Sequence, residues 1–196
     1  MEHEDSRMSD ARPDEELMLC VRNDEVEKLA ELFERHHLAL FNFFARLTGD
    51  RVASEDLVQD TFYRVLKYRR SYKPGTSFRT WMYQIARNVR NDRFRKQRDE
   101  VDIEAAPVPA VLPVDTVEDQ QQTDRLKWAL MQLPEDKREL LLLSRYQGLR
   151  YEEIARLLQC EVGTVKVRVH RALQELRERF YWRDQNRRRP HRTLGG

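Results

Sequence analysis

The sequence has little of the material from which sheets, disulfide scaffolds and membrane spans are made. Only 6 glycines and 7 prolines occur among 196 residues, and strict alternation of apolar and polar residues is hard to find, so nothing favours a β-sheet. Cys20 and Cys160 lie far apart, without a Cys-x-x-Cys motif or an upstream secretory segment, and indicate no disulfide framework. No apolar run approaches the ~20 residues that cross a bilayer. These absences predict a soluble protein of the reducing cytoplasm.

What the sequence has in abundance is charge, arranged in blocks. Charged residues make up 36% of the chain, which favours two small helical modules over one large core. Residues 1–34 hold 12 acids and 4 bases, residues 63–98 hold 12 bases and 1 acid, residues 99–124 hold 8 acids and no base, and residues 125–196 hold 17 bases and 9 acids. Two basic segments separated by an acidic one predict two contacts with a polyanion. An alternation of solvated faces is the other interpretation that charge allows.

Apolar spacing predicts an all-α fold of two small helical domains joined by a flexible linker. Side chains recur at intervals of three and four residues from Val26 to Val89, and again after Val117. Between these stretches, three prolines and five acids without apolar periodicity indicate a linker. The chain is divided into an acidic amino-terminal segment (1–23), a first domain (24–98), an acidic proline-rich linker (99–117), a second domain (118–180) and a basic tail (181–196).

The sharpest local pattern is YEEIARLLQCEVGTVKVRVHRALQEL, residues 151–176. A short helix leads through a turn at residues 159–162 to a second helix, which begins around Gly163 and Thr164. The apolar face of the second helix is Val165, Val169, Ala172 and Leu176, at spacings of four, three and four. Small Ala155 lets the two helices cross closely, so the pattern predicts a helix-turn-helix that reads a major groove. An ordinary helical hairpin with a charged exterior is the alternative.

The stretch SFRTWMYQIARNVRNDRFRKQR, residues 77–98, mixes aromatic and basic side chains on one predicted helix. The residues expected in the core are Phe78, Trp81, Met82, Ile85 and Val89. The residues expected outside or flanking are Arg79, Tyr83, Arg87, Arg90, Asn91 and Arg95, with Asn88 at the border. Arginine contacts phosphate and stacks on bases, so this side is typical of a nucleic-acid surface. Base stacking by Trp81 is an alternative to its burial.

Together these motifs resemble the extracytoplasmic-function (ECF) class of bacterial RNA polymerase sigma factors, within the sigma-70 family. The resemblance rests on SEDLVQDTFYRVL, SFRTWMYQIARN, the acidic linker, LPEDKRELLLLSRYQGLRYEEIARLL and GTVKVRVHRAL, in that order. It implies that the first domain, region 2, binds the clamp of the polymerase β′ subunit and reads the promoter's minus-10 element. It implies that the second domain, region 4, reads the minus-35 element as duplex and meets the flap of the β subunit. Control by an anti-sigma factor is implied as well, and no cofactor.

The resemblance assigns three groups of site residues. The core-polymerase group is Asp56, Gln59 and Asp60. The minus-10 group is Tyr72, Lys73, Ser77, Asn88, Asn91 and Arg95. The minus-35 group is Thr164, Lys166, Val167, Arg168, His170 and Arg171. Within the last group we expect Arg168 on a phosphate, Arg171 on a guanine and Val167 on a thymine methyl. The core-polymerase group shares a helix face away from the apolar residues, as a docking surface requires, and a merely solvated face is the alternative.

Two other functional classes are weighed against this one. A conventional regulator would use only the helix-turn-helix, as a dimer on duplex DNA, and would not need Asp56, Gln59 and Asp60. An enzyme is disfavoured because the five histidines have no zinc-like spacing to cysteine, and no phosphate-binding glycine loop or nucleophile elbow appears. Cys160, in the predicted turn, is expected to be a small buried residue, with a redox role as the other interpretation.

Overall fold

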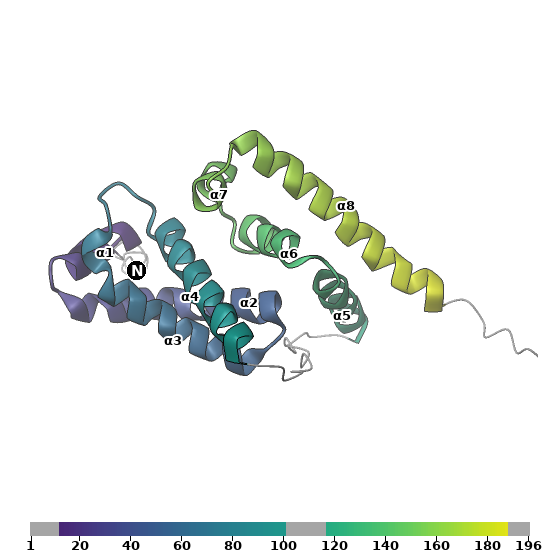
Figure 1. Ribbon diagram of the computed structural model, residues 1–196, viewed down its shortest axis with the longest axis horizontal. Coiled ribbons are helices and arrows are strands. Elements are labelled where there is room, and N and C mark those ends of the chain that lie inside the picture. Colours follow the sequence, from purple (N-terminus) through teal and green to yellow (C-terminus); the bar gives the residue numbers. More distant parts are fainter. Residues whose placement is uncertain (1–11, 101–116, 188–196) are drawn as a thin grey trace, which may run out of the picture. The chain divides into compact units, whose positions relative to one another are not determined.

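A computed structural model describes residues 12–100 and 117–187, and every regular element in them is a helix, which confirms the all-α prediction. Most of the predicted linker and tail lies outside the described residues. The first group of elements is α1 (Asp14–Arg22), η1 (Val26–Lys28), α2 (Leu29–Thr48), α3 (Arg51–Lys67), η2 (Arg69–Ser71) and α4 (Phe78–Glu100) (Figure 1). The second group is α5 (Val117–Met131), α6 (Glu135–Leu141), η3 (Leu142–Tyr146), α7 (Tyr151–Leu158) and α8 (Val162–Arg187). Two compact units hold most of the first group and all of the second, respectively.

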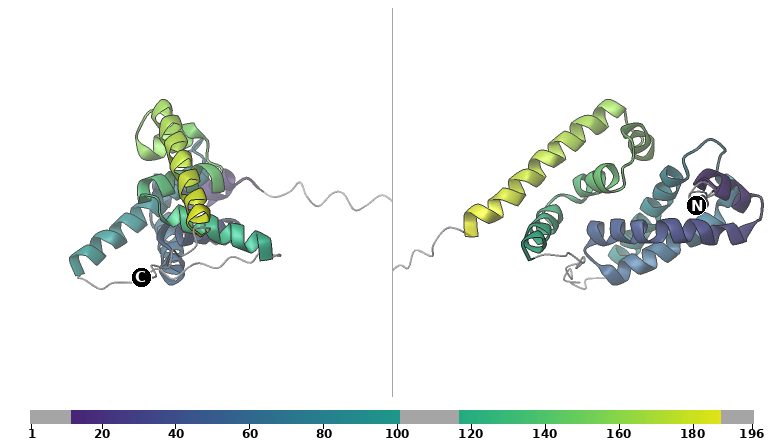
Figure 2. Two further views of the ribbon diagram at one scale, coloured as in Figure 1. Left: turned by 90° about the vertical axis from the view of Figure 1, so that its right-hand side faces the viewer. Right: turned by 180° about the vertical axis from the view of Figure 1, so that it is seen from behind.

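In the first unit, the greater part of α2 and α3 gathers with α4 into one bundle, with α1 at one end, beside the start of α4 (Figures 1 and 2). The core is formed by the apolar faces that the three-and-four spacing predicts. Its buried side chains include Leu32 and Leu40 of α2, Leu57, Val58, Phe62 and Val65 of α3, and Phe78, Met82, Ile85 and Val89 of α4. Between η2 and α4, the chain turns at Gly75, whose φ of 77° suits glycine.

Helix α1 lies within the predicted amino-terminal segment, to which the sequence pattern assigns no structure. Pro13 stands at its N-cap, and three acids in the first turn, Asp14 among them, favour the positive end of the helix dipole. Its apolar side chains Leu17, Met18 and Val21 are completely buried. A nine-residue helix shows only two turns of periodicity, which is too little to stand out in a charged segment.

In the second unit, α8 runs along α5, α6 and α7 and contacts all three (Figures 1 and 2). Pro134 directly precedes α6, and its carbonyl accepts the first backbone hydrogen bonds of that helix. The Arg138 guanidinium donates to the carbonyls of Leu130, Met131 and Leu133 at 3.1, 2.8 and 3.0 Å. These bonds satisfy carbonyls at the end of α5 and just after it, and they fix α6 against α5. Gly148, with a φ of 62°, lies between η3 and α7.

Candidate nucleic-acid and protein-binding surfaces

The predicted core-polymerase residues form one exposed strip of α3, which we name the acidic face: Asp56, Gln59 and Asp60. Their spacing of three and one residues keeps them on one side of the helix, while Leu57 and Val58 beside them are buried. The predicted separation of polar and apolar faces is therefore confirmed.

An ion pair ties the acidic face to α4. Asp56 Oδ2 accepts hydrogen bonds from Arg93 Nη1 and Nη2, at 3.0 and 3.1 Å. The Asp56 side chain remains 54% exposed, so solvent or a protein partner reaches it. Tyr63, 64% exposed and four residues after Gln59, extends the acidic face by one turn. Tyr63 is not among the residues predicted from the sequence, although its spacing of four residues from Gln59 places it on the same side of the helix.

The loop before α4 differs from the prediction at Tyr72. Its side chain is only 1% exposed, and its hydroxyl donates a hydrogen bond to the carbonyl of Thr76. Its ring packs edge-on against Trp81, with the ring centroids 5.2 Å apart. Burial raises the pKa of the Tyr72 hydroxyl to about 12, with help from the nearby carboxylates of Glu15 and Asp14. Tyr72 therefore shapes the loop from inside, and its side chain is not available to DNA.

The remaining predicted minus-10 residues form what we name the loop–helix surface: Lys73, Ser77, Asn88, Asn91 and Arg95. Four of them are exposed, and half-buried Ser77 accepts a hydrogen bond from the Thr80 backbone N–H at 3.4 Å. Arg95 pairs with Asp92 at 3.1 Å, and Asp92 also pairs with Arg64 of α3 at 2.7 Å. The α4 part of this surface is thus held to α3 by charge.

Two aromatic residues of α4 depart from the predicted sorting. Tyr83, expected outside or flanking, is 1% exposed, and burial raises its pKa well above the usual value. It lies beside Met82 and one turn before Ala86, so the buried face of α4 is wider than three-and-four spacing indicates. Trp81, expected in the core, is half-buried against Tyr72.

The predicted minus-35 residues lie on α8, on what we name the recognition face: Thr164, Lys166, Val167, Arg168, His170 and Arg171. All are exposed except half-buried Thr164. On the opposite side of the helix Val165, Val169 and Ala172 are at most 1% exposed, as the spacing predicts. The helix-turn-helix prediction is therefore confirmed, with the second helix beginning at Val162.

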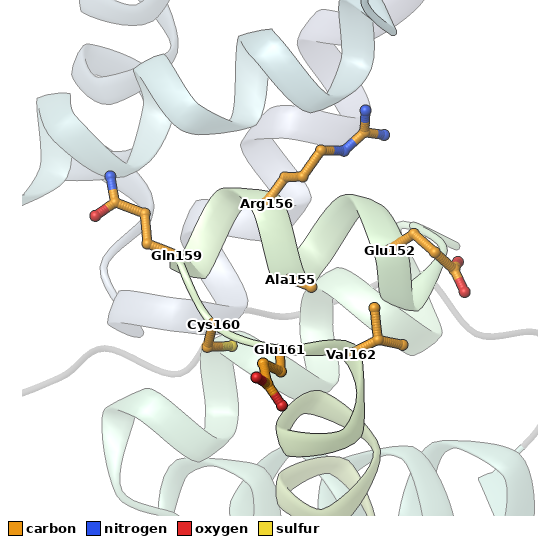
Figure 3. A pocket seen from close by; sticks show the side chains of 7 residues that line it. All are labelled: Glu152, Ala155, Arg156, Gln159, Cys160, Glu161 and Val162. Atoms are coloured by element: carbon orange, nitrogen blue, oxygen red, sulfur yellow. The ribbon is translucent and has the colours of Figure 1, made fainter.

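The turn between α7 and α8 is tighter than predicted. Gln159 takes the left-handed conformation, with a φ of 52°, and the Cys160 backbone N–H donates to the Ala155 carbonyl at 3.0 Å. Cys160 is half-buried rather than buried. The turn borders a hollow of about 900 Å³ (Figure 3). Among its lining residues, Arg156 and Gln159 point to the opposite side from Glu161.

Neither unit presents a metal centre or a membrane span in its described residues. No three His, Cys, Asp or Glu side chains are grouped to hold a metal ion within residues 12–100 and 117–187. In the same part of the chain, no helix combines the length and the apolar character needed to cross a membrane.

Comparison with known proteins gives two family matches. The family described as Sigma-70 region 2 matches residues 32–100, and the family described as Sigma-70, region 4 matches residues 124–176. The first range holds the acidic face and the loop–helix surface, and the second holds the recognition face. Helix α1 precedes both.

Among curated relatives, the RNA polymerase sigma factor CarQ of Myxococcus xanthus is 35% identical over 160 residues, which cover 80% of this chain and 91% of CarQ. The ECF RNA polymerase sigma factor EcfG of Rhodopseudomonas palustris is 34% identical over 142 residues, covering 71% and 77% of the two chains. A solved structure of the sigma factor RpoE with the anti-sigma factor NepR, from Bartonella quintana, is 30% identical with a TM-score of 0.65. That match covers 78% of this chain and 96% of RpoE.

Proposed function

This chain belongs to the ECF class of the sigma-70 family of RNA polymerase sigma factors, and from that premise we propose that it binds core RNA polymerase and directs it to promoters. One observation carries the proposal: matches to region 2 and region 4 stand in a single chain, in that order. A regulator that used the helix-turn-helix alone would have no need of region 2.

The acidic face of α3 is the proposed docking surface for the β′ clamp. Its carboxylates are exposed and stand beside an exposed tyrosine, Tyr63, which supplies contact area at low entropic cost. Asp56 would pair with a basic residue of the clamp, because its side chain is more than half exposed. The β flap is the proposed partner of region 4.

Two surfaces are proposed to read promoter DNA. On the loop–helix surface, Asn88 and Asn91 offer amide groups to base edges, while Lys73 and Arg95 neutralise phosphates of the opened minus-10 strand. On the recognition face, Arg171 would read a guanine in the major groove and Arg168 a phosphate. The domain bounds 24–98 and 118–180 remain proposals, and α1 packs onto the first domain from outside its predicted bound.

We propose that an anti-sigma protein holds the factor inactive. The solved structures that resemble this chain include RpoE with the anti-sigma factor NepR, and CnrH with the cytosolic domain of CnrY at 25% identity and a TM-score of 0.65. The factor itself would work in the cytoplasm with the polymerase, without a cofactor and without catalysis of its own.

Co-elution with sigma-free core polymerase tests the docking proposal. The full chain should elute with core, and the triple variant Asp56→Ala/Gln59→Ala/Asp60→Ala should not. Glu34→Ala is the matched control, because Glu34 is an exposed acid of α2 outside the acidic face. Normal co-elution of the triple variant would remove the acidic face from the proposal. Failure of the unaltered chain to co-elute, with duplex binding intact, would favour a dimeric helix-turn-helix regulator.

A further inference from the structure

We propose that the amino-terminal segment from Asp14 to Asp24 positions the promoter-reading loop, residues 72–77. This segment lies before both family-matched ranges, and no site residue was expected in it. The inference rests on the proposed function of the loop–helix surface, and it makes Glu15 and Asp24 positioning residues for minus-10 reading.

Helix α1 is firmly seated on the first unit. Leu17, Met18 and Val21 are completely buried, and Leu19 and Cys20 are half-buried. At its start, Asp14 Oδ2 lies 2.6 Å from His36 Nε2 of α2, and Asp14 Oδ1 accepts from Arg35 Nη1 at 2.9 Å. The helix therefore has a fixed position from which its other side chains act.

Glu15 reaches the far end of the loop. Its Oε1 accepts a hydrogen bond from the backbone N–H of Phe78, the first residue of α4, at 3.0 Å. The first N–H groups of a helix have no partner inside the helix, and a carboxylate there also meets the positive end of the dipole. Ser77 caps the next turn through a longer bond of 3.4 Å to the Thr80 N–H. Glu15 thus supplies a cap to α4 from another part of the chain.

Asp24 holds the near end of the loop. Its Oδ1 accepts from Arg69 Nη2 at 2.8 Å and Nε at 3.2 Å, and its Oδ2 accepts from Arg70 Nη2 at 3.3 Å. Both arginines belong to η2, which directly precedes Tyr72. The hydrogen bond from Arg69 lowers the pKa of the Asp24 carboxyl below its usual value. Asp24 has a φ of 75°, a left-handed conformation that aspartate tolerates better than most residues.

The loop is therefore fixed at both ends by one short segment, and inside it Tyr72 is bonded to Thr76. Only Lys73 and its neighbours at the tip are left exposed to a partner. A loop that is ordered before binding loses less conformational entropy when it receives a flipped base or a phosphate. Loosening either end should weaken minus-10 reading without touching the docking or minus-35 surfaces.

The test uses the full chain with core polymerase on a promoter fragment identified by transcript-start mapping. Glu15→Ala should lower open-complex formation about 2- to 30-fold, the range expected for loss of a helix cap, and should reduce discrimination against minus-10 substitutions. Glu15→Gln keeps an acceptor oxygen and should retain most of the open-complex formation and most of the minus-10 discrimination. Glu16→Ala, at the exposed neighbouring acid, is the matched control and should behave as the unaltered chain.

Asp24→Asn is the second variant, since asparagine tolerates the left-handed backbone while removing the charge that pairs with η2. It should also reduce minus-10 discrimination. Core affinity and binding to minus-35 duplex should stay unchanged in every variant. The inference is overturned if Glu15→Ala matches Glu16→Ala in minus-10 discrimination, or if core affinity and duplex binding fall equally with it. Loss of core binding by the unaltered chain would instead refute the proposed function.

Discussion

Replacing Arg93 with glutamine isolates the ion pair that engages Asp56 in the free factor. Both partners are partly exposed, 31% for the Arg93 side chain and 54% for Asp56. An ion pair of this kind contributes about 0.2 to 1 kcal/mol. A partner that binds Asp56 must compete with Arg93, so Arg93→Gln should strengthen core binding by about 1.4- to 5-fold.

Asp56→Ala should act in the opposite direction. A charge-assisted hydrogen bond contributes about 1.5 to 3 kcal/mol, so in the Arg93→Gln background Asp56→Ala should lower the affinity for core polymerase about 13- to 160-fold. In the unaltered background this loss of affinity should be smaller, because docking breaks the ion pair between Asp56 and Arg93. The assay is titration of labelled factor with core polymerase at fixed salt, for the two single variants and the double variant. Arg95→Gln is the control, since Arg95 pairs with Asp92 and not with the acidic face. Tenfold weaker binding by Arg93→Gln would refute this reasoning and make Arg93 itself a contact.

Three other predictions concern single side chains. Arg171→Ala should lower the affinity for minus-35 duplex about 5- to 160-fold and relax the preference at one base pair. Arg168→Ala should lower the affinity for all duplex sequences alike and reduce the salt dependence of binding by about one unit of slope. Fluorescence anisotropy measures both effects. Since folding raises the pKa of Tyr72 to about 12, the native chain keeps a proton that the unfolded chain releases from about pH 10. Its free energy of unfolding should therefore fall as the pH rises from about 10 to 12, and the fall should be smaller in Tyr72→Phe. Denaturant titration at each pH measures both. Gln159→Gly should raise the free energy of unfolding by about 0.5 to 1 kcal/mol, because it relieves a left-handed backbone, and lower stability would contradict that cause.

The surfaces that depend on local periodicity could be predicted from the sequence. Polar and apolar residues of α3 alternate at helical spacing, so the exposure of Asp56 and the burial of Val58 follow from a rigid 3.6-residue repeat. The same argument separates Val165 and Val169 from Arg171 on α8. These faces need no knowledge of which helix lies opposite.

The features that depend on contacts between distant segments could not be predicted. Burial of Tyr72 and Tyr83 requires knowing which side chains close over α4, and the spacing within one helix does not contain that information. The bond from the Phe78 N–H to Glu15 joins residues 63 positions apart. Gln159 stands at a left-handed turn position where glycine is the usual signal, so the sequence marks that turn only weakly.

Run-off transcription with the purified chain and sigma-free core polymerase on fragmented genomic DNA tests the central claim most directly. Discrete transcript starts that share two spaced upstream elements are the predicted result, and they should disappear with Asp56→Ala/Gln59→Ala/Asp60→Ala while duplex binding persists. An absence of discrete starts, with the recognition face still binding duplex DNA, would contradict the account.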